Sequence, residues 1–96
     1  MENFDYIIIG AGSAGCVLAN RLSENINNKV LLIEAGGKDS YPWIHIPVQY
    51  YKTMHNPKTD WCYNTEPDET MENRSIPYPR GKTLGGSSSI NGLLYI

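Results

Sequence analysis

Three glycines near the amino terminus have the spacing of a phosphate-binding turn. Gly10, Gly12 and Gly15 form the pattern G-x-G-x-x-G. In a dinucleotide site, the first glycine makes a tight turn, the second lets the backbone approach a pyrophosphate, and the third lets a helix pack closely on a strand. The N–H groups at the start of that helix then face the phosphates. The predicted contacts are Gly10, Gly12, Ser13, Ala14 and Gly15.

An acidic residue follows these glycines at the distance expected of a ribose-binding carboxylate. Glu34 lies 19 residues after Gly15, close to the offset of about 20 residues found in dinucleotide-binding proteins. A carboxylate there accepts hydrogen bonds from an adenosine ribose and repels a 2′-phosphate, and we include the adjacent Ala35 in the predicted site. The alternatives are ordinary turn chemistry for the glycines and a solvated strand end for Glu34. These residues predict dinucleotide binding without separating FAD from NAD.

The sequence around the glycines predicts a strand, a helix and a second strand. Residues 4–9 are β-branched and aromatic, which is typical of a strand buried on both faces. Apolar residues recur at helical spacing from Ala14 to Leu22, a turn-forming cluster follows at 25–28, and residues 30–33 are again apolar. Such a crossover places the two strands side by side and parallel. Residues 1–37 are therefore predicted to form a Rossmann-type βαβ unit of the α/β class.

The rest of the chain divides into two zones of different composition. All six prolines and seven of the ten aromatic residues lie in residues 38–79, which predicts an irregular extension with one short helix between Pro47 and Met54. Residues 80–96 are rich in glycine and serine. There, Gly85 and Gly86 are predicted to present N–H groups as an anion-binding nest, and a serine is predicted to cap a helix that begins near Ile90. Two anion sites in one short chain suit one extended diphosphate ligand.

Length, charge and cysteine content exclude several classes of protein. Ninety-six residues make about one small domain, which is marginal for a doubly wound sheet, so we expect an incomplete domain from an amino-terminal fragment. A net charge of -2 with scattered basic residues gives no field that attracts nucleic acid. Cys16 and Cys62 form no disulfide framework and are expected to be reduced thiols of a cytoplasmic protein. We expect no transmembrane helix and no secretory signal.

Four stretches of the chain resemble the glucose-methanol-choline (GMC) oxidoreductases, an FAD-dependent family. They are residues 5–19, 32–37, 60–67 and 81–95, of which the last is similar to the first signature of the family. The choline-dehydrogenase-like branch is the most similar. The resemblance implies that FAD lies with its pyrophosphate at the first glycine turn and its adenosine ribose on Glu34. It implies further cofactor contacts at Arg80, Thr83, Gly85, Gly86, Asn91, Gly92 and Leu93.

The same resemblance implies catalytic residues beyond this chain. In the family, a histidine far toward the carboxyl end takes the alcohol proton while hydride passes to the flavin. We therefore expect no catalytic residue here. His45 and His55 match no catalytic motif, are expected to pack or lie on the surface, and lack metal-ligand spacing. Some members attach FAD through a histidine of the signature, where this chain has Ile90, so we expect non-covalent FAD.

These expectations combine into one function and two alternatives. We expect the FAD-binding part of an enzyme that oxidises a primary, choline-like alcohol to an aldehyde, inactive as an isolated piece. The alcohol, the electron acceptor, the oligomeric state and a peripheral contact of the intact enzyme with a membrane stay open. The alternatives are an NAD-dependent dehydrogenase fragment, supported by the first glycine turn alone, and a short non-catalytic nucleotide-binding protein that ends at Ile96.

Overall fold

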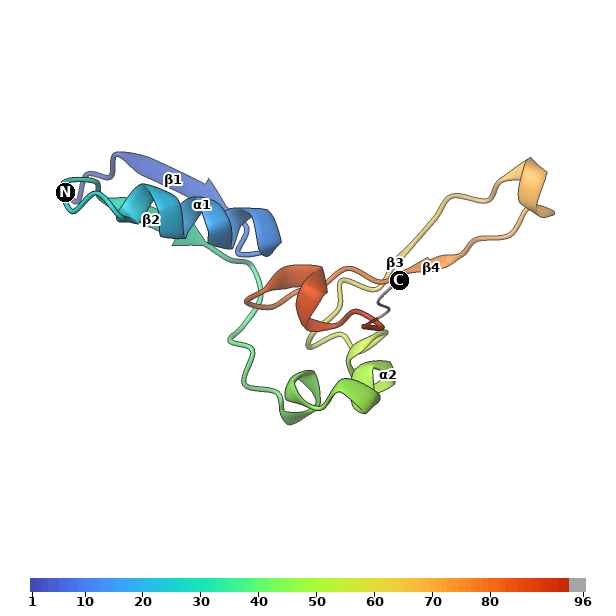
Figure 1. The fold of residues 1–96 in the computed structure, drawn as a ribbon. Helices are drawn as coiled ribbons and strands as arrows, with labels where there is room; N and C mark the ends of the chain where they lie inside the picture. Colours follow the sequence, from blue (N-terminus) through green and yellow to red (C-terminus); the bar gives the residue numbers. More distant parts are fainter. Residues whose placement is uncertain (94–96) are drawn as a thin grey trace.

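A βαβ unit forms the amino-terminal third of the computed structural model, which describes residues 1–93 (Figure 1). Strand β1 (Tyr6–Ile9) leads into helix α1 (Ser13–Ser23) and then strand β2 (Val30–Ile33). The two strands pair in parallel, with Tyr6 opposite Val30 and Ile9 opposite Ile33. The predicted order of elements and the parallel pairing are confirmed, although β1 begins at Tyr6 and not at residue 4.

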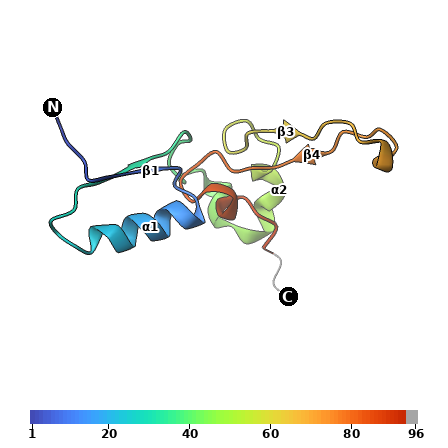
Figure 2. The same cartoon turned by 90° about the horizontal axis from the view of Figure 1, so that it is seen from above.

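The two strands are covered on one face only. Helix α1 lies along this pair of strands (Figure 2), and Ile8 and Gly15 are buried where they meet. Ile7 and Ile9 alternate with Ile8 along β1 and are 61% and 87% exposed. The prediction of a strand buried on both faces is therefore wrong for this chain, because no element among residues 1–93 covers the side chains of Ile7 and Ile9.

Only short elements follow, as the proline content predicts. Two 3₁₀ helices, Pro42–His45 and Pro47–Gln49, lead into helix α2 (Tyr50–Thr53), which confirms the short helix expected between Pro47 and Met54. Proline suits the first position of each 3₁₀ helix because no N–H donor is needed there.

An arm then projects from the body (Figures 1 and 2). Strands β3 (Tyr63–Asn64) and β4 (Pro77–Tyr78) pair antiparallel at its base. A 3₁₀ helix, Glu69–Met71, lies at its tip.

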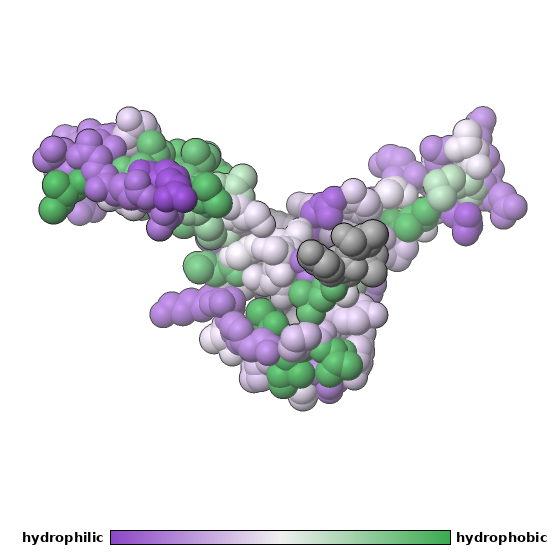
Figure 3. All heavy atoms as spheres, in the orientation of Figure 1, coloured by the Kyte–Doolittle hydropathy of each residue, from purple (hydrophilic) through white to green (hydrophobic). Residues whose placement is uncertain are grey.

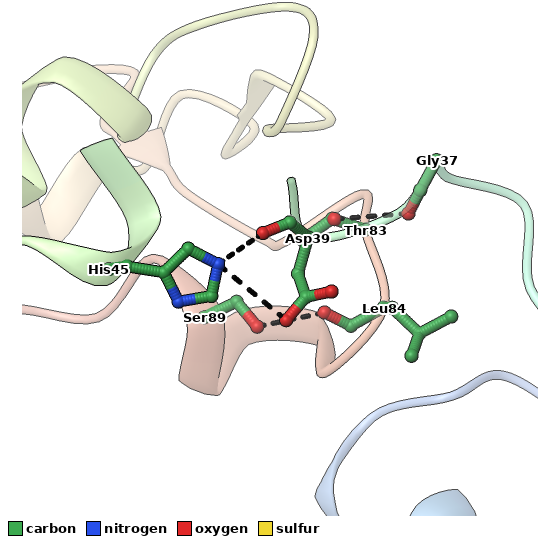
Figure 4. Close-up of polar contacts among 6 residues, drawn as sticks. All are labelled: Gly37, Asp39, His45, Thr83, Leu84 and Ser89. Atoms are coloured by element: carbon green, nitrogen blue, oxygen red, sulfur yellow. Dashed lines mark hydrogen bonds and ion pairs between the residues drawn. The ribbon is translucent and has the colours of Figure 1, made fainter. Parts of the chain in front are cut away.

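The carboxyl-terminal segment returns to the end of the βαβ unit. The N–H of Leu84 donates to the carbonyl of Gly37 at 3.0 Å. The hydroxyl of Thr83 donates to the same carbonyl at 3.1 Å (Figure 4). A 3₁₀ helix, Gly86–Ser89, follows. The predicted helix beginning near Ile90 is wrong, because the three serines lie inside this 3₁₀ helix and Leu93 adopts a φ of 56°. Leu94 and Tyr95, the end of the stretch that resembles the first signature of the family, and the following Ile96 lie outside the described residues.

A small core joins the three zones. Its buried apolar residues are Ile8, Ala11 and Ile90, and its buried polar residues are Thr53, Thr59, Asp60 and Thr83. Apolar surface remains visible on the βαβ unit (Figure 3). Cys16 and Cys62 are both free, as predicted. Within residues 1–93, no helix is long and apolar enough to cross a membrane.

Candidate functional site

A groove of about 560 Å³ opens between the βαβ unit and the carboxyl-terminal segment. The ends of β1 and β2, the first glycine turn, the base of the arm and the second glycine cluster all contribute to it. The predicted residues that line it are Gly10, Gly12, Glu34, Ala35, Arg80 and Gly86, and the lining residues that sequence reasoning missed are Ile9, Ile33, Trp61, Tyr63, Gly81 and Ser87. Two glycine-rich segments far apart in the sequence thus share one cavity.

The glycines of the first turn meet different requirements. Gly10 has a φ of 98°, a conformation that residues with a side chain rarely adopt. At Gly15 a Cβ would lie 1.9 Å from the carbonyl oxygen of Gly10, so only glycine lets α1 pack this closely on the turn. At Gly12 a Cβ would meet no atom within 4 Å. The space beside Gly12 is therefore open, as a cradle for a diphosphate requires.

Helix α1 begins at this turn without a capping side chain. Gly12 is the N-cap residue, in extended backbone, and no side chain among residues 1–93 caps the helix. The N–H of Cys16 donates to the carbonyl of Gly12 at 2.9 Å. The preceding N–H groups, those of Ser13, Ala14 and Gly15, have no partner within the helix and lie at the positive end of its dipole. This arrangement suits an anion.

Glu34 directly follows strand β2, and both of its carboxylate oxygens are bonded to the backbone. Oε2 accepts the N–H of Ala11 at 2.8 Å, and Oε1 accepts the N–H of Gly36 at 2.9 Å. The side chain therefore ties the first glycine turn to the chain that follows β2, a structural role that the sequence did not reveal. Each carboxylate oxygen can accept a second hydrogen bond, so Glu34 can still receive a ribose hydroxyl from the groove.

The second glycine cluster is held directly against the first turn. The N–H of Gly85 donates to the carbonyl of Ala11 at 2.7 Å, and that of Gly86 donates to the carbonyl of Thr83 at 2.8 Å. A Cβ on Gly86 would lie 2.9 Å from the Cα of Gly12. The prediction that Gly85 and Gly86 present an anion-binding nest is therefore wrong, because both N–H groups are already bonded to carbonyls.

Aromatic rings and a cation form another part of the groove lining. The rings of Trp61 and Tyr63 stack, with their centroids 5.8 Å apart and their planes 3° from parallel. The guanidinium of Arg80 lies 4.1 Å from the centroid of the Tyr78 ring, and no carboxylate among residues 1–93 forms an ion pair with it. The groove lining therefore contains a cation without a carboxylate partner beside two stacked aromatic rings, and Lys82 Nζ lies 4.6 Å from the centroid of the Trp61 ring.

Three predicted residues near the end of the described chain line other cavities. Asn91 and Gly92 line a cavity of about 300 Å³. Arg80 and Ser87 line both this cavity and the groove, so the two are adjacent. Leu93 lines only a hollow of about 30 Å³ beside α2. The structure thus brings Asn91 and Gly92, but not Leu93, to an extension of the groove.

The remaining predicted residues are not among those that line the groove: Ser13, Ala14, Gly15, Thr83 and Gly85. Thr83 is 1% exposed and its hydroxyl is bonded to Gly37, so its side chain faces the βαβ unit. The hydroxyl of Ser13 donates to that of Ser88 at 3.2 Å. These contacts hold the two glycine-rich segments together.

The groove is built for binding. His45 contacts Asp39 at the surface (Figure 4), and neither His45 nor His55 lines the groove. In the part of the chain that the structure describes, no group of three His, Cys, Asp or Glu residues could hold a metal ion. The lining supplies hydrogen-bond acceptors, one cation and flat rings, which orient a ligand.

Comparisons with known proteins agree with this site. The family model described as GMC oxidoreductase matches residues 4–96. An alcohol dehydrogenase (acceptor) from Pseudomonas putida is 53% identical over 93 residues, which are 97% of this chain and 17% of that protein. An oxygen-dependent choline dehydrogenase from Vibrio vulnificus is 50% identical over 95 residues, which are 99% of this chain and 17% of that protein. The chain thus spans about a sixth of these relatives.

Solved structures show the same arrangement of elements. Pyridoxine 4-oxidase from Mesorbium loti superposes with a TM-score of 0.91 at 39% identity, over 98% of this chain and 18% of that one. A formate oxidase superposes with a TM-score of 0.81 at 42% identity, over 92% of this chain and 16% of that one. Similarity of both sequence and structure therefore extends over nearly the whole chain.

Proposed function

This chain belongs to the GMC oxidoreductase family, and from that premise we propose that it binds FAD in the groove between its two glycine-rich segments. The observation that carries the proposal is the meeting of Gly12 and Gly86 at one groove, where the space beside Gly12 is open. A bare backbone at this place lets a diphosphate approach the amino end of α1. The donors, acceptor and rings around it fit the other parts of the same cofactor.

Each part of FAD has a suitable partner in this proposal. The pyrophosphate lies at the N–H groups of Ser13 and Ala14, and Arg80, which lines the same groove, supplies a cation without a carboxylate partner among residues 1–93. The adenosine ribose lies at Glu34, whose carboxylate retains accepting capacity. The flavin end extends toward the cavity lined by Asn91 and Gly92, which adjoins the groove. Ile90 is 2% exposed and has no nucleophile, which supports non-covalent binding.

We propose further that the chain is the amino-terminal, cofactor-binding part of an enzyme that oxidises a primary, choline-like alcohol to an aldehyde. When bound, FAD supplies the hydride acceptor. The residues of this chain bind and orient it, and neither of its two histidines lines the groove. Support comes from relatives named as choline and alcohol dehydrogenases at about half identity. The cytoplasmic location stays a prediction.

The experiment uses protein expressed from the complete reading frame. We expect several hundred in-frame residues past Ile96, a yellow protein that releases FAD on denaturation, and bleaching of the flavin by choline without oxygen. A stop codon directly after Ile96 would contradict the assignment to a longer enzyme. A colourless protein that binds NADH would instead favour the NAD-dependent alternative.

A further inference from the structure

Asp60 is a buried carboxylate near the groove but not in its lining. Its residue is 2% exposed. Oδ2 accepts the N–H of His55 at 2.7 Å, and Oδ1 accepts the N–H groups of Cys62 and Arg80, each at 2.9 Å. No ion pair within residues 1–93 involves Asp60. Its negative charge is therefore met by three backbone donors from separate points of the chain.

These donors lie where the proline-rich extension meets the second glycine-rich segment. The N–H of Trp61 donates to the carbonyl of Arg80 at 2.9 Å, and Asp60 and Gly81 form an antiparallel bridge. Trp61, Arg80 and Gly81 all line the groove. The carboxylate of Asp60 is therefore bonded to the backbone at the junction that places one wall of the groove.

The charged form of Asp60 is the form that this junction stabilises. Burial alone would raise the pKa of the carboxyl, but hydrogen bonds from the N–H groups of Cys62, Arg80 and His55 outweigh it and lower the pKa. Hydrogen bonds to an ionised acceptor are stronger than neutral ones. Removing the acceptor would leave three backbone N–H groups without their partner in these part-buried bonds, which lowers stability.

We infer that Asp60 is a positioning residue for the cofactor, one that sets Trp61 and Arg80 at the spacing that FAD requires without touching FAD itself. This inference rests on the proposed binding of FAD in the groove. It predicts that loss of the carboxylate alters both the affinity for FAD and the environment of the bound ring. A role in folding alone would lower stability without changing the spectrum of cofactor bound at saturation.

Asp68 provides a matched control. Its carboxylate also accepts hydrogen bonds within a turn, from the N–H and the hydroxyl of Thr70 at 2.8 and 2.6 Å. It lies beside the 3₁₀ helix at the tip of the arm and lines none of the described cavities. Asp60→Ala and Asp68→Ala thus both remove a carboxylate that accepts a backbone N–H two residues further on, one beside the groove and one exposed at the tip of the arm.

The test compares these variants in protein from the complete reading frame, freed of FAD and titrated with it. We expect Asp60→Ala to raise the Kd for FAD about tenfold or more and to change the visible circular dichroism of flavin bound at saturation. Asp60→Asn keeps one carbonyl oxygen, which can take the place of Oδ1 and hold Cys62 and Arg80, so it should lie between wild type and Asp60→Ala. Asp68→Ala should match wild type in both measurements.

Each other outcome counts against a particular proposal. If Asp60→Ala does not fold, Asp60→Asn is compared with Asp68→Asn, and an unchanged Kd and spectrum for Asp60→Asn overturn the inference. Equal effects at Asp60 and Asp68 overturn it as well. If wild-type protein binds FAD and the Asp60 variants bind it with the same affinity, the inference about Asp60 fails and the proposed function stands. Wild-type protein that binds no FAD removes both.

Discussion

At Gly12 a side chain should be excluded by the ligand and not by the protein. A Cβ there meets no atom within 4 Å, and the φ of -79° suits any residue. We expect Gly12→Val to lower the free energy of unfolding by no more than about 1 kcal/mol, the scale of a poorer N-cap residue, while abolishing measurable FAD binding because its methyl groups fill the diphosphate space. Denaturant unfolding and FAD titration measure the two effects separately.

Gly15→Ala is the companion variant, because there the protein itself excludes the side chain. Its Cβ would overlap the carbonyl of Gly10, so we expect a loss of stability of about 1–3 kcal/mol or more. Flavin retained by Gly12→Val would show that the turn has a structural role only. If Gly12→Val loses as much stability as Gly15→Ala, the protein itself fills the space beside Gly12.

Glu34 combines a structural and a binding role, and one substitution should disturb both. In Glu34→Gln, an amide NH₂ replaces one acceptor and faces the N–H of Ala11 or Gly36. We expect a loss of about 1–3 kcal/mol of stability, the cost of an unpaired donor, and a several-fold weaker affinity for FAD. Glu24→Gln is the control, since Glu24 forms only an exposed pair with Arg21. An equal melting temperature for Glu34→Gln and wild type would show that the carboxylate does not form its hydrogen bonds to Ala11 and Gly36.

At the scale of elements, local patterns predicted the βαβ unit because each of its signals lies within a few residues. The glycine turn, the apolar runs and the helical spacing needed no knowledge of distant segments. Strands β3 and β4 have two residues each, too few to show periodicity, so the pairing that brings Trp61 and Tyr63 toward the groove was invisible. Likewise, the sequence indicated that Gly85 and Gly86 could present N–H groups to an anion, but not that the carbonyls of Ala11 and Thr83 would accept those N–H groups.

The junction between the chain after β2 and the second glycine-rich segment offers a test with adjacent residues. A Cβ on Gly36 would lie 2.1 Å from the carbonyl carbon of Lys82, whereas one on Gly37 would meet nothing within 4 Å. We expect Gly36→Ala to lower the free energy of unfolding by about 1–3 kcal/mol. Gly37→Ala should be neutral or stabilise by up to about 1 kcal/mol through the unfolded state. The reverse order in denaturant unfolding would show that this contact does not form.

At the scale of the whole molecule, the 96 residues expose more surface than a self-contained domain of this mass. The accessible area is 7423 Å², whereas a folded chain of 10.8 kDa typically exposes about 5,500 Å². The radius of gyration is 16.5 Å, against about 12.5 Å for a compact domain of this length. The excess includes the apolar side chains of Ile7 and Ile9, which lie next to an unpaired strand edge.

We therefore expect the isolated 96-residue polypeptide to be marginally stable and inactive. Burial of apolar surface is the main term that offsets the conformational entropy lost on folding, and here much of that surface stays in water. The polypeptide should melt over a broad range, bind the dye ANS and consume no oxygen with choline, whereas protein from the complete reading frame should melt cooperatively. A sharp transition without dye binding would contradict this expectation. It would mean that the contacts within the 96 residues, including those of α1 and of the junction at Gly37, are enough to order the chain.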